Sequence, residues 1–187
     1  MYVHNNEIYV ILNDMSLFIK YCEKGDLLNV QNYSGELNSH IIQQGFYSSC
    51  YNGHIEVVKY LISLKDKYGQ INIHYDNDDA FRYSCYNGHI EVVKYLISLK
   101  NEYGPINIHY YDDFAFRHSC NNGHIEVVKY LISLQDEYGQ INIHYDNDYT
   151  FRWSCINGHI EVVKYLISLK NEYGPINIHY YGDYTFR

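Results

Sequence analysis

The sequence predicts an all-α fold, a solenoid of stacked helix-turn-helix units joined by hairpin-like loops. The first observation is repetition: the thirteen-residue string NGHIEVVKYLISL occurs four times unchanged, and each copy begins 35 residues after the last. The second is that apolar residues recur at helical spacing inside every copy. The third is a glycine-containing turn on each side of that helical segment. Because one such unit cannot bury its apolar face alone, several must stack to share a core.

Residues 74–108 form one period and show its elements in order. The polar run His74–Asp79 predicts a turn or hairpin tip. The apolar segment Ala80–Tyr86 predicts a short helix that packs antiparallel to the next one. A longer helix is predicted over Ile90–Leu99, whose apolar residues fall on one face at i, i+3, i+6 and i+7. Its opposite face carries Glu and Lys at the spacing of an i,i+3 ion pair.

These residues resemble the ankyrin repeat. Asn-Gly-His-Ile-Glu-Val-Val-Lys-Tyr-Leu at 87–96 looks like the centre of that repeat, and Ile-Asn-Ile at 106–108 resembles the Val-Asn-Ala that leads into its next hairpin. Residues 79–85 stand where the family has Thr-Pro-Leu-His-x-Ala-Ala, without the Thr-Pro start and with Arg82 in place of His. The resemblance implies the ankyrin fold and a protein-binding role.

The repeat also differs from the family pattern in length and composition. The family period is about 33 residues, so we expect the extra residues after Leu99 to lengthen the second helix by about half a turn. The richness in Tyr and Asn resembles the ankyrin families of giant DNA viruses.

The repeat divides the chain into seven segments. Residues 22–30 echo residues 50–58 at a spacing of 28 residues, so a degenerate, shortened repeat precedes the regular ones, and its polar substitutions suit a terminal cap. The predicted segments are an N-terminal extension (1–14), a divergent capping repeat (15–38), four ankyrin repeats (39–73, 74–108, 109–143 and 144–178) and a partial repeat (179–187). No polar cap follows the helix around residues 160–169, so we expect its apolar face to be incompletely covered.

Composition restricts the classes of partner and location. The net charge is −8 at pH 7, which disfavours nucleic acid and anionic membranes as partners and favours a protein with a basic surface. The longest apolar run near the N-terminus, Ile8–Leu12, is too short for a signal peptide or a membrane span. We therefore expect a cytoplasmic protein (in the host cytoplasm if it is viral) with reduced thiols.

Three residue types recur once or twice per period. They are cysteine (Cys50, Cys85, Cys120, Cys155), histidine (His54, His89, His124, His159 and His74, His109, His144, His179) and arginine (Arg82, Arg117, Arg152). The cysteines are predicted to be small core residues rather than disulfides, because packed helices lie about 8–10 Å apart. The histidines are predicted to form structural hydrogen bonds, and the arginines to form ion pairs or to donate to loop carbonyls.

Catalytic and metal-binding motifs do not occur in this sequence. It contains no phosphate-binding glycine loop, nucleophile elbow, HExxH or zinc-spaced Cys/His cluster. We therefore expect a protein that is not an enzyme and that has no catalytic residue, cofactor or metal.

The candidate site comes from comparing the copies, because the longer helix is constant while a few positions change. The residues predicted to bind a partner are Asp79, Tyr83, Tyr86, Tyr111, Phe114, His118, Asn121, Tyr149, Trp153 and Ile156. In the ankyrin family such positions line a concave groove, and rigid aromatic side chains there give contact area at low entropic cost. The recurring acids Asp78, Asp113, Asp148 and Asp183 are expected beside them.

Three alternatives stay open at this stage. Relaxed drift at exposed positions gives the same variation, and some aromatic residues would then only pack between repeats. The chain could instead be a structural protein that self-associates through its uncovered C-terminal unit. It could also be a truncated member of an expanded family with no present role.

Overall fold

The computed structural model describes residues 16–177, and no residue in that range is in a β-strand. The predicted all-α repeat solenoid is confirmed. The chain divides into two compact units, Met1–Ala80 (the first unit) and Phe81–Arg187 (the second unit). The predicted extension 1–14 and partial repeat 179–187 lie outside the described residues.

The first unit consists of a helical segment over residues 16–23 and the helices that follow it. These are α2 (Leu27–Gln31), α3 (Ser39–Tyr51), α4 (Ile55–Ser63), α5 (Lys65–Tyr68) and the start of α6 (Tyr75–Tyr86). Both α2 and α3 pack against α4. Gly45 lies in α3 where a Cβ atom would stand 2.9 Å from Cys22 Sγ and 3.0 Å from the Phe18 ring, so this glycine lets the first helix approach closely.

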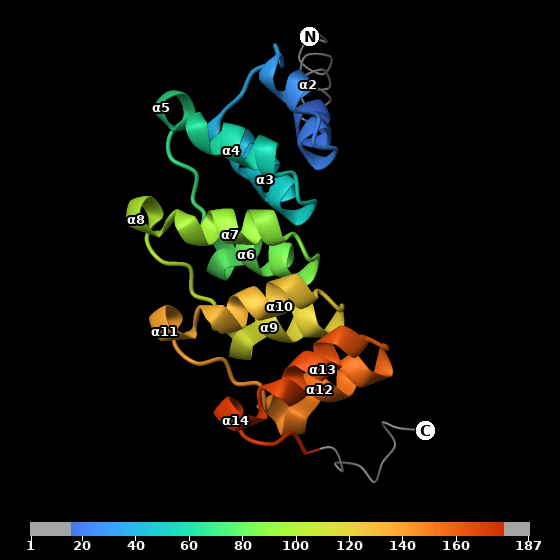
Figure 1. Cartoon of the computed structure of the whole chain (residues 1–187). Helices are drawn as coiled ribbons and strands as arrows, with labels where there is room; N and C mark the ends of the chain where they lie inside the picture. Colours follow the sequence, from blue (N-terminus) through green and yellow to red (C-terminus); the bar gives the residue numbers. More distant parts are fainter. Residues whose placement is uncertain (1–15, 178–187) are drawn as a thin grey trace, which may run out of the picture. The chain divides into compact units, whose positions relative to one another are not determined.

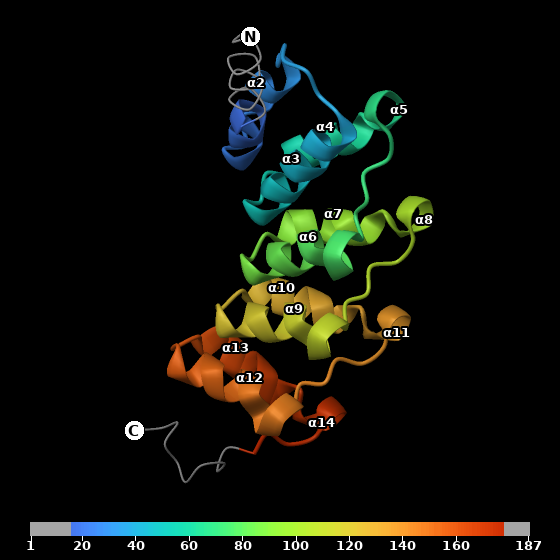
Figure 2. The same cartoon turned by 180° about the vertical axis from the view of Figure 1, so that it is seen from behind.

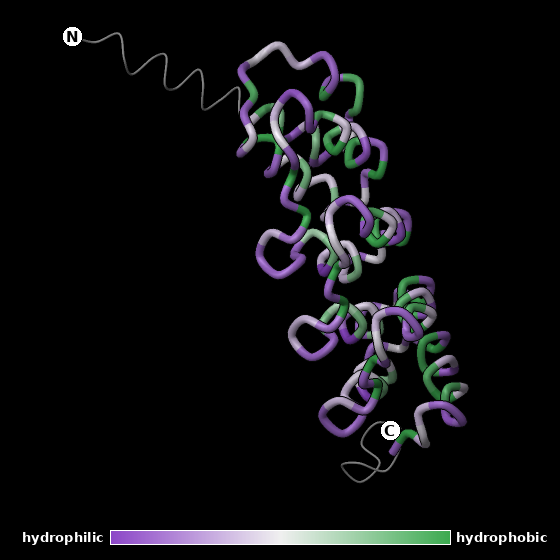
Figure 3. The backbone as a smooth tube through the Cα atoms, turned by 90° about the vertical axis from the view of Figure 1, so that its left-hand side faces the viewer, coloured by the Kyte–Doolittle hydropathy of each residue, from purple (hydrophilic) through white to green (hydrophobic). Residues whose placement is uncertain are grey.

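The second unit repeats one helix pair. It contains the end of α6 and then α7 (Ile90–Ser98), α8 (Lys100–Tyr103), α9 (Tyr110–Asn121), α10 (Ile125–Ser133), α11 (Gln135–Tyr138), α12 (Tyr145–Ile156), α13 (Ile160–Ser168) and α14 (Lys170–Tyr173). The α9–α10 pair lies beside the α12–α13 pair, with α11 and α14 at the same edge (Figures 1 and 2). Hydrophobic and hydrophilic residues alternate along the trace (Figure 3), as amphipathic helices require.

Between the paired helices, the Asn-Gly turns join each repeat to the next one. Gly88 has φ +79°, and a Cβ atom there would lie 2.4 Å from the His124 ring. The His124 Nε2 atom donates to Tyr86 O at 2.9 Å, and His159 Nε2 donates to Asn121 O at the same distance. In the first unit, His54 Nε2 donates to Glu23 O at 2.7 Å. The predicted structural hydrogen bonds of these histidines are confirmed.

The extra residues of the long period form a separate short helix. We expected them to lengthen the second helix, and that prediction was wrong, because α7 ends at Ser98 and α8 follows after Leu99. The Leu99 N–H donates to Leu96 O at 3.2 Å, an i−3 bond that tightens the chain and ends the α-helix. Gly104, at φ +92°, then ends α8.

The hairpin tips contain consecutive residues in the left-handed region. Tyr111, Asp112 and Asp113 have φ of 54°, 53° and 59°, a conformation that costs about 1–2 kcal/mol per residue. Part of this cost is offset because Arg117 donates to Asp112 O at 2.6 Å and to Tyr111 O at 2.8 Å. Arg152 donates likewise to Asn147 O. The predicted role of these two arginines as donors to loop carbonyls is confirmed.

The recurring aspartates are buried parts of the scaffold. Asp113 is 5% exposed; its Oδ1 atom lies 2.5 Å from His109 Nδ1, and its Oδ2 atom accepts from Asn142 N at 2.8 Å. His109 Nε2 donates to Tyr138 O at 2.9 Å. Together, His109 and Asp113 therefore connect their hairpin tip to the loop that precedes the next hairpin tip. Asp148 makes the same contacts with His144 and Asn177 N.

Our expectation that these aspartates lie on the binding surface was therefore wrong. Asp78, Asp113 and Asp148 are all buried, each against the histidine four residues before it. In the first unit, Gln43 occupies the position that corresponds to Asp78. Its side-chain amide accepts from Asn72 N at 2.9 Å and donates to Asn72 O at 3.0 Å.

Candidate protein-binding surface

The variable positions fall on one face of each short helix. Phe114 and His118 are four residues apart on α9. On α12, Trp153 follows Tyr149 by four residues and Ile156 follows Trp153 by three. Residues i, i+4 and i+7 share a helix face. We call the part of this surface in the second unit the aromatic face: Tyr83, Tyr86, Tyr111, Phe114, His118, Tyr149, Trp153 and Ile156.

Four members of the aromatic face form a ring cluster across two repeats. The Tyr83 and Phe114 centroids lie 6.1 Å apart, and the Phe114 and His118 centroids 4.0 Å apart. Tyr86 completes the cluster, 5.5 Å from His118 and 6.0 Å from Tyr83. All four are partly exposed. Such tilted ring pairs stabilise one another, so the cluster is a preorganised surface.

The next repeat continues the face with larger and more exposed side chains. Tyr149 and Trp153 stand 5.9 Å apart, and Trp153 is 40% exposed. Ile156 is 61% exposed at the end of α12. A half-exposed Trp beside an exposed Ile is an apolar surface that a partner can bury.

Arg82, which was predicted to form an ion pair or to donate to loop carbonyls, also contacts the rings of this face. Arg82 is 7% exposed, and its guanidinium lies 4.9 Å from the Tyr111 ring centre and 5.4 Å from that of Phe114. Tyr111 itself is 53% exposed. The guanidinium holds two rings through their faces, so Arg82 positions the aromatic face. The sequence signal for Arg82 was the recurrence of Arg once per period. The stacking could not be predicted from that signal, because the rings that Arg82 contacts, Tyr111 and Phe114, belong to the next repeat.

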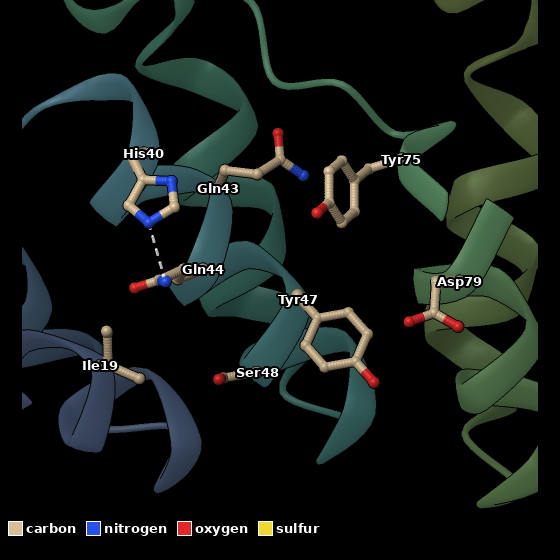
Figure 4. A pocket seen from close by; sticks show the side chains of 8 residues that line it. All are labelled: Ile19, His40, Gln43, Gln44, Tyr47, Ser48, Tyr75 and Asp79. Carbon is tan, nitrogen blue, oxygen red and sulfur yellow. Dashed lines mark hydrogen bonds between the residues drawn. The ribbon is translucent and has the colours of Figure 1, made fainter. Parts of the chain in front are cut away.

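Two predicted residues lie elsewhere. Asn121 is buried, its backbone O accepts from His159 and from Asn157 Nδ2, and it offers no exposed side chain to a partner. Asp79 belongs to the first unit, where it lines a pocket with residues of α3 (Figure 4).

Burial changes the pKa of several side chains in the described part of the chain. Burial raises the pKa of the Cys85 and Cys120 thiols well above the ordinary value and that of Cys22 to about 12, so these thiols stay protonated and unreactive. Burial, followed by the charge of Arg117, lowers the pKa of His118, so it is neutral in the ring cluster at pH 7.

Two further absences concern residues 16–177. Within this range, no three His, Cys, Asp or Glu side chains are grouped so as to hold a metal ion. None of the helices there combines the length and the apolar character needed to cross a membrane.

Comparison with known proteins supports the fold. The family model described as ankyrin repeats (3 copies) matches residues 22–112 and 105–178. These ranges include every repeat that the structure describes in full. A comparison with curated proteins gave no match.

Proposed function

The chain belongs to the ankyrin-repeat family, and from that premise we propose that it is a non-enzymatic protein-binding module whose aromatic face contacts the partner. The observation that supports the proposal most directly is the run of partly exposed rings from Tyr83 to Trp153, held by ring contacts within the second unit. Large rigid side chains lose little entropy on binding, and Trp and Tyr are the residues that most often dominate binding energy.

Charge indicates the chemistry of the partner. The chain carries a net charge of −8, and Asp112 and Asp146 are exposed at the hairpin tips near the start of α9 and α12. Arg82, by contrast, is covered by rings. The exposed surface therefore favours a partner with Lys or Arg beside an apolar patch, and the affinity should fall as salt is added. If the chain is viral, as its Tyr- and Asn-rich repeats suggest, that partner is a host protein.

The test is a capture experiment followed by a binding measurement. Wild type and the double variant Tyr149→Ala, Trp153→Ala are compared, with Lys129→Ala, an exposed residue of α10, as the matched control. Proteins held by wild type and the control but lost from the double variant are then purified and titrated by calorimetry. We expect the double variant to weaken binding by about thirty-fold, equivalent to about 2 kcal/mol. The proposal would be refuted if the capture experiment found no protein whose binding depends on the aromatic face.

Self-association is the second candidate function, and it rests on α13. Ile160 is 58% exposed and Ile167 45% exposed, whereas Ile132, the counterpart of Ile167 in α10, is 6% exposed. An exposed apolar helix face favours contact with a second copy. Light scattering over a range of concentrations tests this: wild type should associate and Ile167→Lys should not. A monomer at high concentration excludes it, and a chain with neither a partner nor self-association would be one without a present role.

A further inference from the structure

A pocket of about 360 Å³ lies in the first unit, between the helical segment at 16–23, α3 and the start of α6. It is lined by Ile19, His40, Gln43, Gln44, Tyr47, Ser48, Tyr75 and Asp79. In Figure 4 the Tyr75 ring and the Asp79 carboxylate both extend from α6 toward α3, where the Tyr47 ring stands. Two tyrosine rings and a carboxylate thus border one opening.

Because the sequence repeats, the residues that line this pocket can be compared with the equivalent residues of a later repeat. Tyr47 and Tyr75 correspond, 70 residues on, to Arg117 and Tyr145. In the second unit, the Arg117 guanidinium stacks on the Tyr145 ring, 4.5 Å from its centre. The first unit has Tyr in place of that Arg, and within the described residues no cation stacks on Tyr75, which is 61% exposed.

The charge at this place also changes. Asp79, in the same repeat as Tyr75, corresponds to Tyr149 of the second unit. The place where the preceding repeat has Tyr47 instead of an arginine therefore has an added carboxylate beside the tyrosine. A guanidinium is planar, stacks on aromatic faces and forms paired hydrogen bonds with a carboxylate. The exposed Tyr75 ring, the Asp79 carboxylate and the open volume of the pocket all fit a guanidinium.

We propose that the pocket bounded by Tyr47, Tyr75 and Asp79 binds an arginine side chain of a partner protein. The side chain lies against the Tyr75 ring as Arg117 lies against Tyr145, and its guanidinium donates to the Asp79 carboxylate. This site is additional to the aromatic face and does not depend on the function proposed for it.

The test uses NMR of the isotopically labelled full chain and three short probes. These are the end-capped tripeptides Gly-Arg-Gly, Gly-Lys-Gly and Gly-citrulline-Gly. We expect saturable amide shifts at residues 40–48 and 75–79 with the arginine probe, about five-fold weaker binding of lysine, and none of neutral citrulline. Free arginine, whose own carboxylate is repelled by Asp79, should bind more weakly than the capped probe, which separates a protein source from the free amino acid.

Variants identify the residues. Tyr47→Arg restores the residue of the other repeats, so its own guanidinium should occupy the pocket and abolish binding of the probe. Tyr47→Phe should retain binding, and Asp79→Asn should weaken it about ten-fold. The proposal is overturned if the arginine probe causes no saturable shifts, if citrulline or lysine binds equally well, or if Tyr47→Arg binds as wild type does. Tyr149→Ala with Trp153→Ala should leave probe binding unchanged, so failure of this site and failure of the aromatic face are distinguishable.

Discussion

The helices α10 and α13 have the same sequence, IEVVKYLIS, yet they are packed differently. Val128 of α10 is fully buried and Ile132 is 6% exposed, whereas their counterparts Val163 and Ile167 of α13 are partly exposed and 45% exposed. Identical residues therefore contribute differently because their neighbours differ. In a repeat protein, stability is the sum of each repeat and its interfaces, and this pair of helices separates the two contributions.

The largest expected difference comes from shortening the paired isoleucines. Ile132→Ala removes buried atoms from between α10 and its neighbours and should lower the free energy of unfolding by about 2–5 kcal/mol. The same change at Ile167, which is already 45% exposed, should cost no more than about 1 kcal/mol. Urea unfolding of both variants gives the comparison, and equal losses would mean that the interface of α10 contributes little.

The glycines that precede these helices sharpen the comparison. Gly123 and Gly158 have φ of +78° and +74°, so an alanine would be strained at both positions. A Cβ atom at Gly123 would lie 2.5 Å from the His159 ring, whereas a Cβ atom at Gly158 would meet nothing within 4 Å. Gly123→Ala should therefore destabilise by about 1–3 kcal/mol more than Gly158→Ala. Thermal unfolding of both variants measures this. A similar loss in the two would show that the histidine ring moves aside freely.

A smaller effect, of opposite sign, is expected in the short helices. α12 carries Thr150 where α9 carries Ala115, and the Thr150 hydroxyl is buried without a hydrogen-bond partner. Thr150→Val keeps the shape and removes the unpaired group, so it should stabilise the protein by about 1 kcal/mol. Ser119→Ala is the contrasting control, because that hydroxyl donates to Ala115 O at 2.7 Å and its removal should destabilise. Urea unfolding measures both, and a loss of stability in Thr150→Val would mean that the hydroxyl has a partner.

The sequence was sufficient to predict the features set by local pattern. Repetition and helical periodicity predicted the paired helices. The structural role predicted for His124, which follows an Asn-Gly turn, is confirmed by its hydrogen bond to Tyr86 O. Burial of Asp113 was not predictable in this way, because an acid within a polar run looks exposed. Its second partner, Asn142 N, lies 29 residues farther along the chain. Likewise, comparison of the copies identified Asn121 as variable, but variation alone does not distinguish an exposed position from a buried one.

The separate helix α8 shows the same limit. The two extra residues were visible in the repeat length, but whether they extend a helix or begin another depends on the i−3 bond at Leu99. The pocket at Tyr47 is an intermediate case. The substitution of Tyr for Arg was present in the sequence, but its meaning required the Arg117–Tyr145 contact of the second unit.

The smallest effect is the titration of His124, which opens α10. Burial lowers the pKa of His124 below its ordinary value of 6.5, and the opposing hydrogen bond to Tyr86 O only partly compensates. A histidine whose pKa is lower in the folded state stabilises the fold most above its unfolded pKa. That stability is lost as the pH falls below about 6.5. We therefore expect the free energy of unfolding to decrease on acidification from about pH 7.5 to pH 5.

His124→Gln isolates this contribution, because the Gln amide can still donate to Tyr86 O but does not titrate. The pH dependence of unfolding should be shallower in the variant than in wild type, while His118, whose pKa is also lowered, titrates in both. An NMR midpoint for His124 above 6.5 would contradict the argument. It would mean that the Tyr86 carbonyl outweighs burial, and that the turn between α9 and α10 is more accessible to water than its packing against the preceding repeat indicates.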